Sequence, residues 1–130
     1  VYGPRHIKSG EMATVIGIFE DLYKKKKPLT IVKPGNQTRR FTHISDTINV
    51  CFEAWKKNKC SYYSISHRKS HSIVEVAKMF KCKYKYLKSR SGERYSSALT
   101  SMSMNNRIIK RYGKIYLKDY ITSFIKDSKL

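Results

Sequence analysis

The chain has 130 residues, of which 40% are hydrophobic, and it carries a formal net charge of +19. Its length fits one compact domain with a modest core, and its hydrophobic content excludes a disordered chain. No apolar run approaches the roughly 20 residues that span a bilayer, so we expect no membrane partner. Because the first residue is not methionine, we expect the chain to be a piece of a longer protein.

The three cysteines, Cys51, Cys60 and Cys82, are an odd number and have no CxxC spacing. This pattern argues against a disulfide framework and against a zinc site. It predicts reduced thiols, which are typical of a cytoplasmic protein. We expect Cys51 to be a small residue of the core.

The first third of the chain predicts a short strand, a helix and a second strand. Val1–Pro4 is extended and ends at a proline. From Glu11 to Tyr23 apolar residues recur with a helical period behind an acidic first turn, and the lysine run 24–27 with Pro28 ends this helix. Leu29–Lys33 (LTIVK) then has the composition of a strand.

A turn at residues 34–36 (PGN) precedes a second short strand, predicted at Phe41–Ile44. Ser45 or Asp46 is expected to cap the helix that follows. The apolar face of this helix is predicted to be buried and consists of Ile48, Cys51, Phe52 and Trp55.

The second half continues the alternation. Residues 60–66 alternate like a strand, and Ser72 with Glu75 forms a capping box for a helix. A strand is predicted at 84–88 and a short helix at 106–112. The last helix carries an apolar stripe made of Leu117, Tyr120, Ile121, Phe124 and Ile125. This order predicts an α/β domain with a small mixed sheet and flanking helices.

Catalytic motifs are missing from these residues. The sequence has no nucleophile with an oriented base, no paired carboxylates, no glycine-rich dinucleotide loop and no Walker loop. His67 and His71 have helical i, i+4 spacing but lie in a loop without carboxylate or cysteine neighbours. We therefore predict surface or capping histidines, no metal site and no catalytic residue.

Arginines are the residues that best suit a ligand. Arg39 and Arg40 follow the turn at 34–36, and Arg90 and Arg94 flank a Ser-Gly pair in KSRSGER. Arginine is preferred where a phosphate needs fixed bidentate geometry. The pattern is equally consistent with ordinary arginines at strand ends.

The chain contains 20 lysines and 8 arginines, and the lysines are spread almost evenly along the sequence. Even spreading favours a solvated surface and makes a nucleic-acid partner unlikely, since a binding stripe would be clustered. A small basic nucleic-acid-binding module stays open as an alternative, because KCKYKYLK (81–88) mixes tyrosines that could stack on bases with lysines.

Three segments resemble a known family. VYGPR (1–5), PLTIVKPGNQTRRFTHISDTI (28–48) and RSGERYSS (90–97) are similar to the C-terminal half of the extended short-chain dehydrogenases/reductases, in the group of NAD-dependent nucleotide-sugar epimerases and dehydratases. The resemblance covers nearly the whole chain. It implies the substrate-binding lobe of a Rossmann-type enzyme, a fragment whose N-terminal dinucleotide-binding domain lies outside these residues.

The resemblance also implies roles for individual residues. Tyr2, Gly3 and Pro4 would approach the nicotinamide of NAD or NADP, and Arg39 and Arg90 would grip the diphosphate of a nucleotide-diphosphate sugar from two sides. The backbone that meets the nucleobase would be that of Leu29, Thr30, Ile31 and Val32.

Two departures from the family limit these implications. Arg40 stands where relatives keep an aspartate, and neither the glycine-rich loop nor the family's Tyr-x-x-x-Lys pair is present. We therefore expect this chain to be inactive alone and to hold no cofactor alone. Its expected partners are a nucleotide-diphosphate sugar, its own N-terminal domain and, in the full-length enzyme, a second copy. A non-catalytic interaction domain on the same fold stays open as a further alternative.

Overall fold

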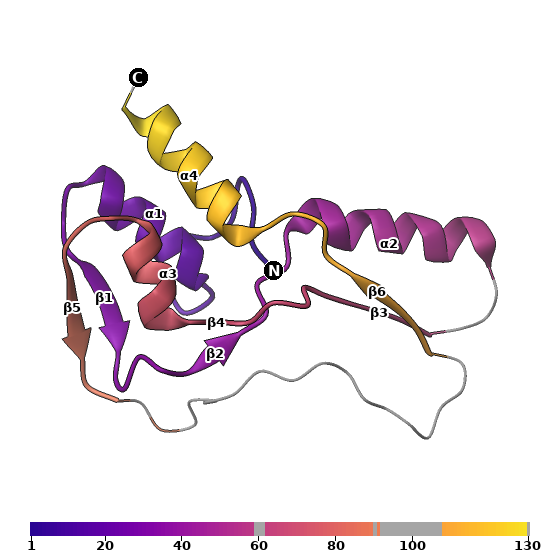
Figure 1. Ribbon diagram of the computed structural model, residues 1–130, viewed down its shortest axis with the longest axis horizontal. Helices are drawn as coiled ribbons and strands as arrows, with labels where there is room; N and C mark the ends of the chain where they lie inside the picture. Colours follow the sequence, from indigo (N-terminus) through magenta and orange to yellow (C-terminus); the bar gives the residue numbers. More distant parts are fainter. Residues whose placement is uncertain (59–61, 90, 92–107, 130) are drawn as a thin grey trace.

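The computed structural model describes residues 1–58, 62–89, 91 and 108–129 (Figure 1). The elements run in the order α1 (Val15–Lys24), β1 (Leu29–Val32), β2 (Thr38–Arg39), α2 (Ile44–Lys57), β3 (Tyr62–Ser66), β4 (His71–Ser72), α3 (Ile73–Met79), β5 (Tyr84–Leu87), β6 (Ile108–Tyr112) and α4 (Leu117–Ser128). Among the described helices, none is long and apolar enough to cross a membrane.

The main body is built on the parallel pair β1–β5, in which Leu29 lies opposite Tyr84 and Val32 opposite Leu87. Helices α1 and α3 both contact β1, and α4 packs beside α3. Side chains of alternate β1 residues point to opposite faces, so Leu29 and Ile31 are fully buried. The buried hydrophobic core of the described residues consists of Tyr2, Ile16, Phe19, Leu29, Ile31, Ile73, Val76, Ala77, Phe80, Leu117 and Ile121.

A second layer, formed by α2 and the parallel pair β3–β6, projects from the main body as an arm (Figure 1). Tyr62 lies opposite Ile108 and Ser66 opposite Tyr112. The helix predicted at 106–112 is wrong for residues 108–112, which form β6, and residues 106 and 107 lie outside the described part. Pairing with a distant strand overrides the local pattern here, because β-branched residues suit a pleated surface.

The strands do not form one sheet. The antiparallel pair β2–β4, with Arg39 opposite His71, joins the main body to the arm and is separate from the other two pairs. The α/β class predicted from the sequence is confirmed, with three small two-stranded sheets among the described residues in place of the one mixed sheet expected.

Helix α1 begins later than predicted. Thr14 is its N-cap, and its hydroxyl accepts a hydrogen bond from the Gly17 amide at 3.0 Å. Glu11 and Met12 therefore precede the helix, and the first turn contains no acidic residue. The predicted start at Glu11 is wrong because the hydroxyl of Thr14 satisfies the free amides that a helix start requires.

The start of α2 also differs from the prediction. Its N-cap is His43, whose ring Nδ1 accepts a hydrogen bond from the Ser45 amide at 3.1 Å. Ser45 and Asp46 lie in the first turn instead of capping it. The strand predicted at 41–44 is wrong, since the short strand in this region is β2 and His43 forms an isolated parallel bridge with Tyr2.

The apolar face of α2 is exposed, contrary to the prediction. Trp55 is 76% exposed, and Ile48, Cys51 and Phe52 are also exposed. The prediction that Cys51 is a core residue is wrong, because this face of α2 points away from the strands that the helix covers. By contrast, the predicted Ser72 cap of α3 is confirmed: its hydroxyl accepts a hydrogen bond from the Glu75 amide at 3.1 Å, while the Glu75 carboxylate lies 3.2 Å from the His71 ring.

Candidate functional site

The turn between β1 and β2 is closed by the buried side chain of Gln37. Its Oε1 accepts a hydrogen bond from the Gly35 amide at 2.7 Å, and its Nε2 donates to the Val32 carbonyl at 2.9 Å. Gly35 has φ +89°, a left-handed conformation that favours glycine. A Cβ at Gly35 would also lie 3.1 Å from side-chain atoms of Ile31 and Tyr86. This turn therefore fixes the direction in which the chain enters β2 and positions Arg39.

Arg39 lies between two cavities. One, of about 190 Å³, is lined by Thr30 and Val32 of β1 together with Gln37, Arg39 and Leu87. The other, of about 470 Å³, extends from Val1 to Arg39 and Arg40. The Arg39 guanidinium donates to the Thr38 carbonyl at 2.8 Å. Arg39 and Val15 both lie in the walls of the two cavities, and Arg39 is the charged residue of this shared wall.

Arg40, the next residue, bonds to backbone carbonyls of a segment far away in the sequence. Its guanidinium donates to the carbonyl of His67 at 3.4 Å and to the carbonyl of Arg68, at the end of β3. The two adjacent arginines therefore have different partners, and Arg40 fixes the loop after β3 to the start of α2.

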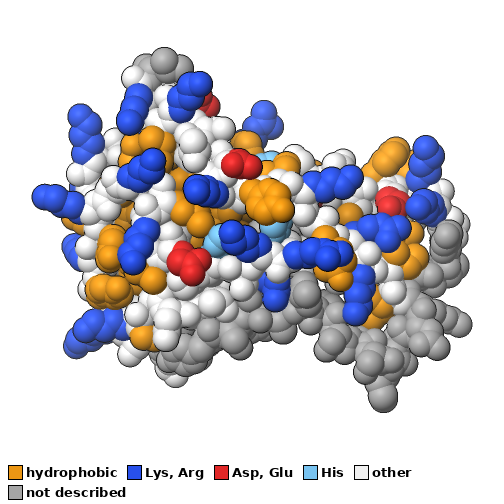
Figure 2. Space-filling view, viewed as in Figure 1, with side chains coloured by type: hydrophobic (Ala, Val, Ile, Leu, Met, Phe, Trp, Pro, Cys, Tyr) orange, Lys and Arg blue, Asp and Glu red, His pale blue; other side chains and the backbone are white. Residues whose placement is uncertain are grey.

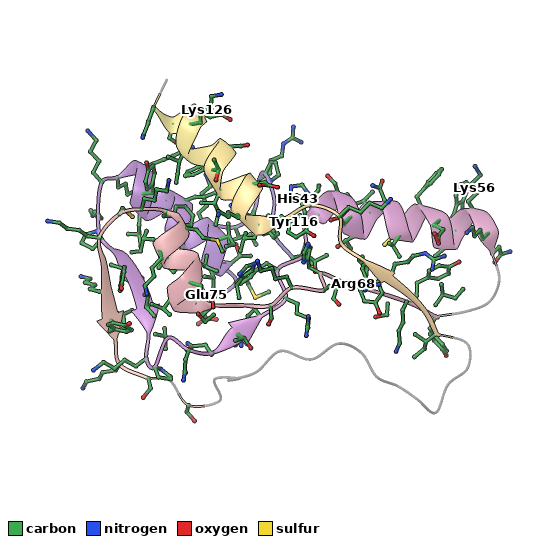
Figure 3. All side chains as sticks on the ribbon, in the orientation of Figure 1. His43, Lys56, Arg68, Glu75, Tyr116 and Lys126 are labelled. Atoms are coloured by element: carbon green, nitrogen blue, oxygen red, sulfur yellow. The ribbon has the colours of Figure 1, made fainter. Side chains whose placement is uncertain are left out.

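A buried network surrounds the start of α2. The Asp46 carboxylate accepts hydrogen bonds from the amides of Lys114 and Ile115 at 2.9 and 3.0 Å, and so ties α2 to the segment before α4. His67 lies beside it, and its amide donates to the Thr42 hydroxyl. The His67 ring is edge-on to that of Tyr116, which is labelled in Figure 3, with centroids 4.8 Å apart. Burial lowers the pKa of His67.

The histidines differ from their predicted placement. His67 and His71 are both buried, so the surface prediction is wrong, although His67 does act as a local cap by accepting from the Lys69 amide at 3.1 Å. The His71 ring lies 3.2 Å from the Glu75 carboxylate. Among the described residues, no three acidic, histidine or cysteine side chains come together in a way that could hold a metal ion.

A second carboxylate, Glu20, is buried on the core side of α1. It accepts a hydrogen bond from the Tyr120 hydroxyl at 2.9 Å and contacts His6. Burial, and then the bond to Glu20, raise the pKa of Tyr120. Sequence reasoning missed Glu20, although its position one helical turn after Ile16 on the apolar stripe was a signal. These contacts tie α1, α4 and the loop after Pro4 together, and they serve the fold.

The segment 2–4 lies against the start of α2. The Tyr2 amide donates to the Thr42 carbonyl at 3.0 Å, and the Ile44 amide donates to the Tyr2 carbonyl at 2.7 Å. The Tyr2 ring is buried edge-on against His43, and burial raises the pKa of its hydroxyl. A Cβ at Gly3 would lie 2.5 Å from Ile44, so close packing requires this glycine. Pro4 is exposed and is the member of the segment best placed to meet a ligand.

Comparison with solved structures shows which proteins share this fold. UDP-glucuronic acid 4-epimerase from Bacillus cereus, solved with UDP-glucuronic acid and NAD, is 23% identical with a TM-score of 0.77; the match covers 98% of this chain and 42% of that one. UDP-glucose 4-epimerase from Thermotoga maritima, solved with UDP-glucose, is 17% identical with a TM-score of 0.75 over 96% of this chain and 42% of that one. The chain has the fold of part of a nucleotide-sugar epimerase.

A curated sequence is also similar. UDP-glucuronic acid decarboxylase 1 from Xenopus tropicalis is 31% identical over 81 residues, which are 62% of this chain and 18% of the decarboxylase. No family model matches the sequence. The chain thus spans less than half the length of the epimerases and decarboxylase that it matches, and the resemblance indicated by the three sequence motifs is confirmed at the level of the fold.

Within this epimerase fold, the structure brings together some of the predicted site residues. Thr30, Val32 and Arg39 line one cavity. The side chains of Leu29 and Ile31 lie in the core, so only their backbone groups could meet a ligand. Arg90 lies outside the described residues. Gln37, which the sequence reasoning treated only as part of a motif, is the residue that positions Arg39.

The fit to NAD is limited. The space that a Cβ would occupy at Gly3 is filled by Ile44 and forms no cradle for a ligand. The Tyr2 side chain is buried in the core, which leaves Pro4 and the backbone to meet a nicotinamide. Of the three residues predicted to approach the cofactor, Pro4 is therefore the one that is exposed.

Proposed function

We propose that this chain supplies the nucleotide-sugar-binding portion of an NAD-dependent epimerase or dehydratase. The observation that carries the proposal is the position of Arg39 in the wall shared by two cavities. A guanidinium there can form charge-assisted hydrogen bonds to a diphosphate while the two ends of the ligand extend to either side.

The proposal assigns each cavity to one end of the ligand. The nucleobase would lie against Thr30 and Val32 in the smaller cavity, bounded by Leu87. The sugar would lie in the larger cavity, which extends toward Val1 and so toward the segment assigned to the nicotinamide. Arg90, by resemblance, would contact the diphosphate from the other side. Hydride transfer is the chemistry that NAD supplies; the residues of this chain would bind and orient the substrate.

The exposed face of α2 supports a protein partner for the same function. We define the α2 apolar face as Ile48, Cys51, Phe52 and Trp55; the rings of Phe52 and Trp55 lie 5.8 Å apart. Parallel sheets are normally covered on both sides, whereas β3–β6 is covered by α2 alone among the described elements. An open apolar face beside a parallel pair suits the dinucleotide-binding domain of an epimerase, which we propose as its occupant.

Calorimetric titration with a UDP-sugar or a dTDP-sugar tests the ligand assignment. Arg39→Ala is expected to weaken binding about 10- to 100-fold, since a charge-assisted contact contributes about 1.5–3 kcal/mol. Arg39→Lys keeps the charge without the bidentate fork and should fall in between. The matched control is Lys56→Ala near the C-terminal end of α2, which removes an exposed charge that lines neither cavity. Equal affinity of Arg39→Ala and the control would overturn the assignment.

A further inference from the structure

Lysines from three distant segments of the sequence come together around one cavity. A cavity of about 1000 Å³ in the main body is lined by residues of three segments: 23, 24 and 26–28; 81–83; and 128–129. We call it the lysine pocket. Six of its lining residues are lysines and none is acidic: Lys24, Lys26, Lys27, Lys81, Lys83 and Lys129. Figure 2 shows lysine and arginine side chains over this end of the molecule.

The lysine pocket is separate from the proposed nucleotide-sugar site. Leu29 begins β1 and bonds to the carbonyl of Lys83, so the pocket lies at the amino ends of the β1–β5 pair. Val32 and Leu87, which line the smaller cavity beside Arg39, lie at the carboxyl ends of the same strands. A ligand of the lysine pocket therefore has different neighbours from a nucleotide sugar.

Neutralisation of helix ends does not account for six lysines. The ends of α1, α3 and α4 all lie at the pocket, and each helix C-terminus carries about half a negative charge. Three such ends offset roughly 1.5 of the six positive charges. Lys24 also lies over the Phe124 ring, 5.4 Å from its centre. A large positive surplus thus remains around an open hollow.

Two of the lysines occupy positions where glycine is the favoured residue. Lys26 (φ 57°) and Lys81 (φ 54°) are left-handed and follow the C-caps of α1 and α3. The Lys26 amide donates to the Tyr23 carbonyl and the Lys27 amide to the Leu22 carbonyl, the bonding of a Schellman motif, in which this position is usually glycine. The chain thus carries charged side chains at two strained positions, both of which face the pocket.

We propose that the lysine pocket binds a small oligophosphate anion, such as pyrophosphate or tripolyphosphate. Lysines are compact charges that gather around a multiply charged phosphate without the fixed geometry that arginine imposes. A hollow bounded by three segments suits a small anion better than nucleic acid, which would need a continuous basic stripe beyond it. Tyr84 and Tyr86, although exposed, do not line the pocket.

Titration with tripolyphosphate at constant ionic strength tests the proposal on the chain. Lys26→Gly with Lys81→Gly removes two charges at positions that favour glycine, so the double variant should keep or raise its melting temperature while its affinity falls about tenfold. Lys56→Gln with Lys110→Gln removes the same charge from the distant arm, where Figure 3 shows Lys56, and should bind within twofold of the parent chain.

Three results would overturn the proposal. Unchanged affinity for tripolyphosphate in Lys26→Gly with Lys81→Gly would mean that these lysines only neutralise the helix ends. An equal loss of affinity in this variant and in Lys56→Gln with Lys110→Gln would mean that the anion responds to the overall charge of the chain and not to the pocket. Affinity for single-stranded oligonucleotides that rises with length, without saturable tripolyphosphate binding, would indicate a nucleic-acid surface. Lys27→Gln with Lys83→Gln repeats the test without a backbone change. Thiol alkylation locates the bound anion. Tripolyphosphate should slow the alkylation of Cys82 in the pocket and leave the alkylation rate of Cys51 on α2 unchanged.

Discussion

At the scale of single residues, Gln37 links the sequence motif to the site. The run GNQTRRF (35–41), within the segment 28–48 that resembles the family, could be recognised from the sequence, and its glycine as part of a turn. The role of the glutamine could not, because it depends on two backbone groups, of Gly35 and Val32, that approach one another only in the folded chain.

Gln37→Ala should lower the free energy of unfolding by about 2–3 kcal/mol, since it leaves the buried Gly35 amide and Val32 carbonyl without their partner and opens a small cavity. Urea denaturation measures this change. Asn36→Ala, at the exposed neighbouring position, is the control and should cost less than about 0.5 kcal/mol. Similar values for the two variants would contradict the role assigned to Gln37.

His67 makes stability depend on pH. Its pKa in the folded state is lowered below the ordinary 6.5, chiefly by burial, so the unfolded chain binds the proton more readily. The stability that the neutral ring supports is present above pH 6.5 and is lost as the pH falls below it, with a slope of at most about 1.4 kcal/mol per pH unit.

Chemical denaturation between pH 7.5 and pH 5 should show this loss in the parent chain. His67→Asn, which cannot titrate but retains a side-chain hydrogen-bond acceptor, should flatten the curve in that range. A curve with the same slope in His67→Asn would show that other groups account for the dependence.

At the scale of elements, the sequence predicts that α2 is an amphipathic helix but not which of its faces is buried. Its length and amphipathic pattern follow from the sequence, but the pattern alone predicted a buried face. Whether an apolar helix face is buried depends on whether another element packs against it. In the described part of the chain, no element covers this face of α2. The His43 cap was missed for a related reason: histidine is an uncommon cap, and the serine and aspartate after it are common ones.

Trp55→Ser should change the free energy of unfolding of the chain by less than about 0.5 kcal/mol, because the side chain is exposed. Phe80→Ala in the core should cost about 3–5 kcal/mol. Thermal or urea denaturation compares the two. The same Trp55→Ser change is expected to weaken association with a dinucleotide-binding domain, measured by co-purification. A cost above about 2 kcal/mol in the isolated chain would contradict the exposed placement of the α2 apolar face.

At the scale of the whole molecule, the main body and the arm have different roles in the proposal. The main body would carry the nucleotide-sugar cavities at the carboxyl ends of β1–β5 and the lysine pocket at the amino ends. The arm would present α2 and β3–β6 to the rest of an epimerase. The α/β class and the resemblance could be predicted from sequence, whereas the arm and the pocket could not, since both depend on contacts between distant segments.

The most direct test of the nucleotide-sugar assignment is an NMR titration of the chain with UDP-glucose, following the backbone amides. The proposal predicts shifts concentrated at Thr30, Val32, Gln37, Arg39 and Leu87, which line the cavity beside Arg39. Shifts confined to 23–28 and 81–83, or no saturable shifts at residues 30–39, would contradict the assignment of these cavities to a nucleotide sugar.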